Sequence, residues 1–244
     1  MGLERADPSR RAAFAAAGLL TAGAVLSLPG CARPASDADK PGQADVSAVD
    51  DLMREHGVLR RLLVVYRETA GVIRASAATL DIAALGQAAD LFRSFGEDYH
   101  EKALEEAHIF PMVKKAGGRA ASLIDTLIAQ HRRGREINDY LTGLAKSGGV
   151  RTGQAEPLAQ ALESFARMYE IHAAIEDTEV FQAWRATLNA KELDAWSDKF
   201  EDIEHQTFKG DGFDLALEQV AGIEQRLGLS DLARYTAPAP PTST

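Results

Sequence analysis

The feature that most constrains the fold is the helical spacing of apolar residues, which continues through most of the region from residue 47 to residue 227. Apolar side chains recur three or four positions apart, as one face of an α-helix requires. No stretch of useful length alternates between apolar and polar residues as a half-buried strand does. Ala, Leu, Glu and Arg, which all favour helix, are plentiful. The chain is therefore predicted to be all-α.

Capping and turn residues divide this region into four long helices and two shorter ones. Ser47 is placed to cap the first helix, and Asn189 to cap the fifth. Glycine pairs separate the second helix from the third and the third from the fourth. We predict long helices at about 47–76, 81–115, 119–146 and 157–188, and shorter ones at about 189–207 and 213–227. Such helices pack most simply as an antiparallel up-down-up-down four-helix bundle, here with one or two additional C-terminal helices.

The two ends of the chain are predicted to lie outside the bundle. Residues 31–46 are rich in Pro, Ala, Asp and Gly and have no helical spacing, so we expect a disordered tether. Residues 236–244 have the composition of a disordered tail. The bundle is therefore predicted to occupy residues 47–235.

The first thirty residues have the three parts of an export signal. Arg10 and Arg11 precede an apolar span (12–28), and the sequence Leu-Pro-Gly-Cys follows, ending at Cys31. The arginine pair resembles a twin-arginine export signal, and the segment before Cys31 resembles a bacterial lipobox. We expect residues 1–30 to be a signal peptide and Cys31 to carry a lipid that holds the protein on a membrane surface, in the periplasm or at the cell surface. The alternative is a permanent N-terminal anchor helix.

The charge and cysteine content exclude two classes of protein. The net charge is −9, so the basic face that nucleic-acid binding needs is missing. The single cysteine excludes a disulfide framework within one chain. The sequence also offers no obvious nucleophile, phosphate-binding loop or organic-cofactor motif, because its glycine pairs fall at helix ends.

The histidines are spread one to each long predicted helix. In the fourth helix, Glu176 follows His172 by four residues, so the two lie about 40° apart on one face. They share that face with Phe165 and Phe181, which should point inward. Buried charges need partners, and a metal ion between helices would provide one for all these groups. The four candidates are His56, His100, His131 and His172.

Each of these histidines also has a simpler interpretation. A single histidine on a helix is more often a core or surface residue than a metal ligand. His56 and His131, taken alone, lie among charged residues typical of a solvated helix face. The joint pattern across four helices favours a metal site, but the spacing by itself leaves both interpretations open.

Four segments resemble, in order, the motifs of the hemerythrin-like, or HHE cation-binding, family. They are REHG (54–57), DYHEKALEEAHIFP (98–111), QHRRG (130–134) and HAAIEDTEVF (172–181). The resemblance covers roughly residues 50–215 and implies an antiparallel four-helix bundle with a non-haem di-iron centre. Carried over motif by motif, it implies His56, His100, His131 and His172 as imidazole ligands, with Glu176 and one glutamate of the second helix as bridging carboxylates.

The choice of that second glutamate depends on the local geometry of the helix. The family places His and Glu four residues apart, whereas His100 and Glu105 are five apart, about 140° on a regular helix. A one-residue π-bulge would bring both to one face. On a regular helix Glu101, Glu105 and His108 would face inward and His100 outward. We favour the bulge, which makes Glu105 the ligand and leaves His108 near the same face as an outer or replacement ligand.

The donor set indicates the chemistry. Imidazole and carboxylate suit iron, and zinc or manganese are also candidates. Our leading hypothesis is a protein with two iron ions that binds O₂ or nitric oxide for sensing, storage or scavenging, rather than an enzyme. The alternatives are a di-iron enzyme acting on peroxide or nitric oxide, a ferritin-like oxidase, and a metal-free helical interaction module. Glu105 and His108 provide one of the two Glu-x-x-His pairs that a ferritin-like site needs, and we find no second pair.

Overall fold

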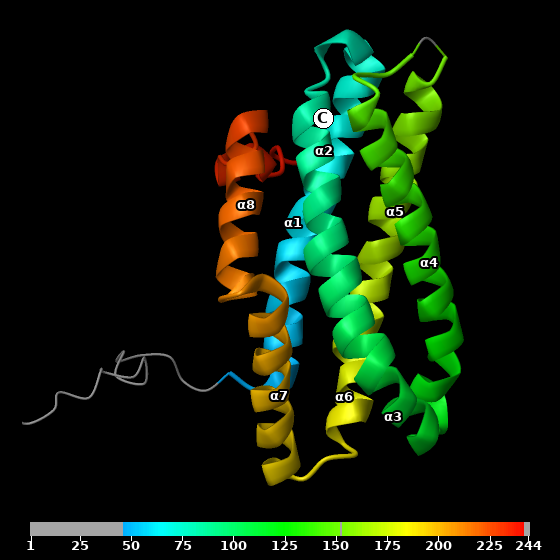
Figure 1. Ribbon diagram of the computed structural model, residues 1–244. Helices are drawn as coiled ribbons and strands as arrows, with labels where there is room; N and C mark the ends of the chain where they lie inside the picture. Colours follow the sequence, from blue (N-terminus) through cyan, green and yellow to red (C-terminus); the bar gives the residue numbers. More distant parts are fainter. Residues whose placement is uncertain (1–45, 152, 242–244) are drawn as a thin grey trace, which may run out of the picture. The chain divides into compact units, whose positions relative to one another are not determined.

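The computed structural model describes residues 46–151 and 153–241, and all regular structure in these residues is helical (Figure 1). Six helical rods pack as a bundle, as predicted. The first and third rods are α1 (Ala48–Ser76) and α4 (Gly118–Lys146). The fifth and sixth are α7 (Ala190–Phe208) and α8 (Gly212–Leu227). Short 3₁₀ turns, η2 (Ala77–Thr79) and η5 (Leu232–Tyr235), follow α1 and α8.

The second and fourth rods each contain a π-helical segment between two α-helices. The second rod consists of α2 (Ile82–Leu91), the π-helical η3 (Phe92–Ile109) and α3 (Phe110–Ala116). The fourth consists of α5 (Ala155–Ile175), the π-helical η4 (Glu176–Val180) and α6 (Phe181–Arg185). The chain runs up, down, up and down through the four long rods, with α1 packed on α5 and α2 on α4 (Figure 1). The predicted antiparallel four-helix bundle with additional C-terminal helices is confirmed.

The helix ends lie close to the predicted positions because the capping residues act locally. Ser47 accepts a hydrogen bond from the Asp50 backbone nitrogen at the start of α1. Asn189 and Glu192 form a reciprocal capping box at the start of α7. The second rod ends at Gly117, where the chain adopts a φ of 78° that favours glycine. These local signals fix the rod lengths and thereby the level at which the rods face one another.

Aromatic rings fill the part of the core next to the buried polar groups. Phe92 contacts Phe165 edge to face, with ring centroids 4.9 Å apart, and it contacts Tyr169 at the same separation. Tyr169 in turn lies 5.3 Å from the ring of His172. Such pairs have defined geometry as well as buried area, so this part of the core holds one histidine in a fixed place.

The C-terminal helices α7 and α8 cover one side of the bundle, along α1 and the second rod (Figure 1). Their corner is tight: α7 ends at Lys209 with a left-handed φ of 61°, and Phe208 packs directly against Gly212. The Glu204 carboxylate accepts a hydrogen bond of 2.7 Å from the Phe213 backbone nitrogen. Burial raises the pKa of Glu204 to about 7.

This shifted pKa predicts how the stability of the metal-free protein depends on pH. The folded protein keeps a proton on Glu204 that the unfolded chain releases above its ordinary pKa of 4.5, so stability falls as pH rises from 4.5 to 7. Glu204→Gln should therefore stabilise the protein at pH 8 by about 1–3 kcal/mol, since one pKa unit corresponds to about 1.4 kcal/mol. Urea unfolding of chelator-treated protein at pH 5 and pH 8 measures this. An equal difference at both pH values would contradict it.

Some of the predicted segments lie outside the described residues. These are the export signal, Cys31 and all of the tether except Val46. At the other end, residues 236–241 are exposed and form no helix. Within residues 46–151 and 153–241, no helix combines the length and apolar character needed to cross a membrane.

Candidate metal centre

Four buried imidazoles, one from each long rod, meet inside the bundle. They belong to α1, η3, α4 and α5, and each is at most 3% exposed. They form two pairs that face each other through Nε2: His56 and His100 at 3.0 Å, and His131 and His172 at 3.0 Å. The structure therefore brings together all four histidines that the sequence identified as candidates.

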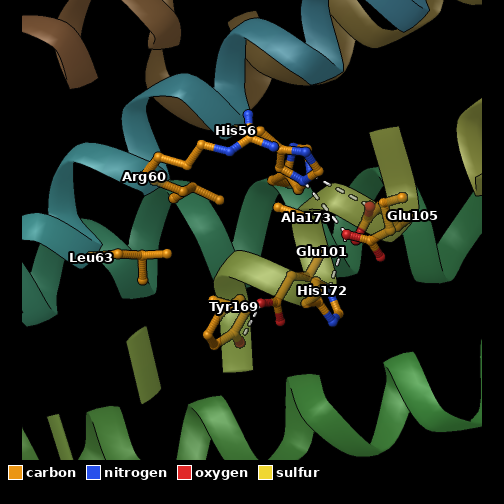
Figure 2. A pocket seen from close by; sticks show the side chains of 11 residues that line it. His56, Arg60, Leu63, Glu101, Glu105, Tyr169, His172 and Ala173 are labelled. Carbon is orange, nitrogen blue, oxygen red and sulfur yellow. Dashed lines mark hydrogen bonds and ion pairs between the residues drawn. The ribbon is translucent and has the colours of Figure 1, made fainter. Parts of the chain in front are cut away.

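Two buried glutamates, Glu105 and Glu176, lie between the imidazole pairs, and Figure 2 shows Glu105 at the centre of the bundle. Glu105 Oε1 lies 3.5 Å from His100 Nε2, and its Oε2 lies 3.4 Å from His131 Nε2. Glu176 Oε2 lies 3.5 Å from His56 Nε2 and 3.0 Å from His172 Nε2. Each carboxylate thus reaches one imidazole of either pair, which is the position of a bridging ligand.

The π-helical backbone of η3 explains how His100 and Glu105 share a face although they are five residues apart. In a π-helix the hydrogen bonds join residues five apart, so side chains at that spacing lie next to each other. The prediction of π geometry is confirmed, but its extent was wrong. The π-helix continues over 18 residues rather than forming a one-residue bulge. The spacing of one pair of side chains carries no information about the flanking turns, so the length of the π-helix could not be predicted from it.

The regular-helix alternative does not agree with the structure. His100 points inward and is 1% exposed. Glu101 is also buried, but its carboxylate accepts hydrogen bonds from Tyr169 at 2.7 Å and from Arg135 at 2.9 Å. The expectation for His108 was wrong, because its ring packs 5.3 Å from that of Trp196 on α7. The contact with α7 could not be read from the second helix alone.

Each imidazole donates its Nδ1 proton to a polar group on another rod. Because carboxylate and amide oxygens can only accept, Nδ1 carries a proton in all four rings. In a neutral ring, Nε2 then presents its lone pair to the centre of the bundle. Such outer hydrogen bonds orient metal-binding imidazoles and raise their basicity. The bonds are His56 to Asp177 at 2.7 Å, His100 to Glu55 at 2.5 Å, His131 to Glu106 at 2.9 Å and His172 to Gln130 at 2.8 Å.

These four acceptors form a closed ring around the bundle. The first rod supplies the acceptor for the second, the second for the third, the third for the fourth and the fourth for the first. None of these four acceptors was predicted from the sequence. A usable signal was present, since each acceptor is the direct neighbour in sequence of a cluster residue: Glu55 of His56, Glu106 of Glu105, Gln130 of His131 and Asp177 of Glu176.

Burial determines the protonation of the cluster. It lowers the pKa of His56 to about 3 and the pKa values of His131 and His172 to about 4. These three imidazoles are therefore neutral at neutral pH, as metal ligands must be. Burial opposes protonation of His100 too, but Glu105 and Glu55 outweigh it and raise its pKa. Burial also raises the pKa of Glu176, to about 8.

The unpaired atoms of the cluster fit a pair of metal ions. All four carboxylate oxygens of Glu105 and Glu176 are buried and accept no hydrogen bond from any group in the described residues. With the Nε2 atoms of the neutral imidazoles, these oxygens form a group of electron-pair donors that face one another. Unpaired buried polar groups are costly, and cations between them would remove that cost. Ligand atoms within 4.8 Å of one another define two sets: His56, His100 and Glu105, and Glu105, His131, His172 and Glu176.

A third set of neighbouring ligand types does not have this character. Glu101, Glu106 and His131 also lie close together. Arg135 already bridges the two carboxylates, with Nη2 at 2.9 Å from Glu101 and 2.5 Å from Glu106. Arg135 and the Tyr169 hydroxyl provide these carboxylates with hydrogen-bond donors, so they are not left unpaired as Glu105 and Glu176 are.

A small cavity of about 10 Å³ opens beside the cluster, between α1 and α5 (Figure 2). Space of this size holds about one water-sized molecule. The hydroxyl of Tyr169 reaches Glu101 at its edge because Gly134 lies opposite, where a Cβ atom would stand 2.0 Å from that oxygen. Five cluster residues line the cavity, together with Leu59, Arg60, Leu63, Glu101, Tyr169 and Ala173.

The geometry of η3 predicts opposite results for two neighbouring glutamates. Glu105→Gln should remove most of the bound metal, because Glu105 contacts one imidazole of each pair. Glu101→Gln should leave the metal content near that of the wild type, because the Glu101 carboxylate pairs with Tyr169 and Arg135 instead. Elemental analysis of both purified variants, with circular dichroism to verify helix content, measures the difference. Metal loss only in Glu101→Gln would contradict this assignment.

Comparisons with known proteins agree with the pattern of residues. A family model described as the hemerythrin HHE cation-binding domain matches residues 47–184. Uncharacterised proteins of Mycobacterium bovis and Mycobacterium tuberculosis are each 40% identical to this chain over 210 residues. The aligned region covers 85% of this chain and 80% of each relative. No solved structure matches it significantly.

Proposed function

The chain belongs to the hemerythrin HHE cation-binding family, and we propose that it is a non-haem di-iron protein that binds O₂ or nitric oxide. The observation that carries the proposal is the set of bare ligand atoms: four buried carboxylate oxygens without hydrogen-bond donors, facing four imidazole Nε2 atoms. Neither a packed core nor a solvated helix face accounts for this arrangement.

The residues of the chain divide into two metal positions. His56 and His100 would hold one ion, and His131 and His172 the other, with Glu105 and Glu176 between them. The donors are imidazole and carboxylate, which suit iron and also permit zinc or manganese. Ferrous ions held by these residues would supply the reversible binding of O₂ or nitric oxide.

The cavity supports a diatomic ligand. Its volume of about 10 Å³ excludes organic substrates and leaves room for a molecule of about the size of water. Leu59, Leu63 and Ala173 provide an apolar wall, which keeps bulk water away from the cluster. The Tyr169 hydroxyl, which also lines the cavity, is fixed by its hydrogen bond to Glu101.

The proposal is tested by iron content and absorption spectra. Protein purified from iron-supplemented cells should contain a pair of iron ions per chain. After anaerobic reduction, its spectrum should change on exposure to O₂ or nitric oxide and return when the gas is removed. Protein without iron, or iron-loaded protein whose spectrum is insensitive to both gases, would overturn the proposal.

A second candidate is a di-iron enzyme that acts on peroxide or nitric oxide. It is favoured by one observation: a hydroxyl and a carboxyl group, from Tyr169 and Glu101, line the cavity next to the cluster. Reductive reactions of these substrates consume protons, and both groups are chemically able to carry them. Steady-state turnover of peroxide or nitric oxide with a reductant would favour the enzyme, and reversible binding without turnover would favour the carrier.

We also propose that the protein is exported and held on a membrane surface by a lipid on Cys31. The support is the sequence Leu-Pro-Gly-Cys behind an apolar span with an arginine pair before it. Cys31→Ser should move the protein from the membrane fraction to the soluble extracytoplasmic fraction. Fractionation of expressing bacteria measures this, and an unchanged distribution would contradict a lipid at Cys31.

A further inference from the structure

The four imidazoles differ in the charge of the groups that hold them. His56 and His100 both donate Nδ1 protons to carboxylates, Asp177 and Glu55. Glu55 is 1% exposed, and its second oxygen accepts a hydrogen bond of 2.9 Å from Tyr99, which is a neutral group. Among the described residues, no arginine or lysine forms an ion pair with Glu55, so its negative charge acts directly on His100.

The other pair has a weaker set of acceptors. His172 donates to the neutral amide oxygen of Gln130. His131 donates to Glu106, but Arg135 binds the same carboxylate oxygen at 2.5 Å and is only 16% exposed at its side chain. Arg135 thus offsets part of the negative charge close to His131, where Glu101 Oε2 also lies 3.8 Å from His131 Nδ1.

Asp177 also forms an ion pair, with Arg60, but this pair is more exposed to solvent. Its partner Arg60 is 41% exposed at the side chain, so solvent screens the arginine charge more strongly than it screens Arg135. His56 and His100 therefore donate to two carboxylates, whereas His131 and His172 donate to one carboxylate and one neutral amide. Bridging by Glu105 does not remove this difference, since its oxygens lie 3.5 and 3.4 Å from the two sides.

We propose that the two metal positions are unequal, and that the His56/His100 position binds its ion first and more tightly. A carboxylate that accepts the Nδ1 proton makes Nε2 a better electron-pair donor, whereas a neutral amide does so less. The two positions are therefore occupied one after the other. Gln130 is the residue that keeps the metal affinity of the His131/His172 position lower. This inference rests on the proposed metal site.

Zinc is a suitable probe because it is redox-inert and accepts the same donors. Calorimetric titration of metal-free protein with Zn²⁺ should show two steps that differ in affinity by about 10-fold or more, the range that outer hydrogen-bond partners produce. Gln130→Glu should strengthen the weaker step and bring the two together. The matched variant Asp177→Asn, which keeps an oxygen for His56, should weaken the tighter step instead.

Crystals grown with one equivalent of Zn²⁺ identify the position directly. Anomalous density is expected at His56 and His100. Density at His131 and His172, equal density at both positions, or two identical binding steps would overturn the inference and leave the metal site standing. An absence of zinc binding in both steps would overturn the metal site and this inference together.

Discussion

Glu176→Gln is expected to abolish the binding of both ions. Glu176 Oε2 lies within 3.5 Å of an imidazole Nε2 atom in each pair, so the substitution removes a charged ligand from two positions at once. Loss of an outer hydrogen-bond partner weakens a metal site by about 10- to 100-fold, and loss of a bridging ligand should cost more than about 100-fold. Purified Glu176→Gln protein should contain iron at or near zero by elemental analysis.

Two further measurements separate ligand loss from misfolding. Glu179→Gln changes a glutamate in the same turn that pairs with Arg119 at the surface, and it should leave the iron content unchanged. Above pH 8, metal-free Glu176→Gln protein should also unfold at a higher temperature than metal-free wild type, because it no longer buries the charge that Glu176 carries once it loses its proton. Full iron content in Glu176→Gln would remove this residue from the proposed ligand set.

Removal of the metal is expected to lower the melting temperature by about 10 to 30 °C. Two ions held between them by residues of four separate rods would bind the folded state alone, and each site stabilises by about 4 kcal/mol when free metal is about 1,000-fold above its dissociation constant. For a domain of this size, about 1 kcal/mol corresponds to a shift of about 2–4 °C. Thermal unfolding by circular dichroism, with and without chelator, measures the shift.

The control for this prediction is the variant without the bridging ligand. Chelator should leave the melting temperature of Glu176→Gln unchanged, because that variant has little metal to lose. Equal melting temperatures of the wild type with and without chelator would mean that the cluster tolerates its unpaired oxygens. The inference that these oxygens require bound metal would then be contradicted.

The fold was predictable because its determinants are local. Ser47, Asn189 and Gly117 act through their own backbone neighbours, and they set helix boundaries to within a few residues. The position of Glu105 was also accessible, because a spacing of five residues from His100 is compatible with a shared face in π-helical geometry and not in a regular α-helix.

The outer contacts were not predictable by the same reasoning. Glu55 is next to His56 in sequence, yet it holds His100, 45 positions away. His108 was placed near the cluster, whereas α7 offers it aromatic rings instead. Both results depend on how the rods rotate and slide against one another. That is decided by the packing of the whole bundle and is invisible in the pattern of any one helix.

The ring of Nδ1 hydrogen bonds has a consequence for how the centre assembles. Each rod donates an Nδ1 hydrogen bond to one neighbouring rod and accepts one from another, so the four hydrogen bonds form a closed ring. In a fragment that lacks any one rod, one remaining imidazole has no acceptor for its Nδ1 proton and one remaining acceptor has no imidazole donor. The metal site should therefore form in a single concerted event when the last rod docks, and grafting it onto another scaffold would require moving the four acceptors together with the ligands.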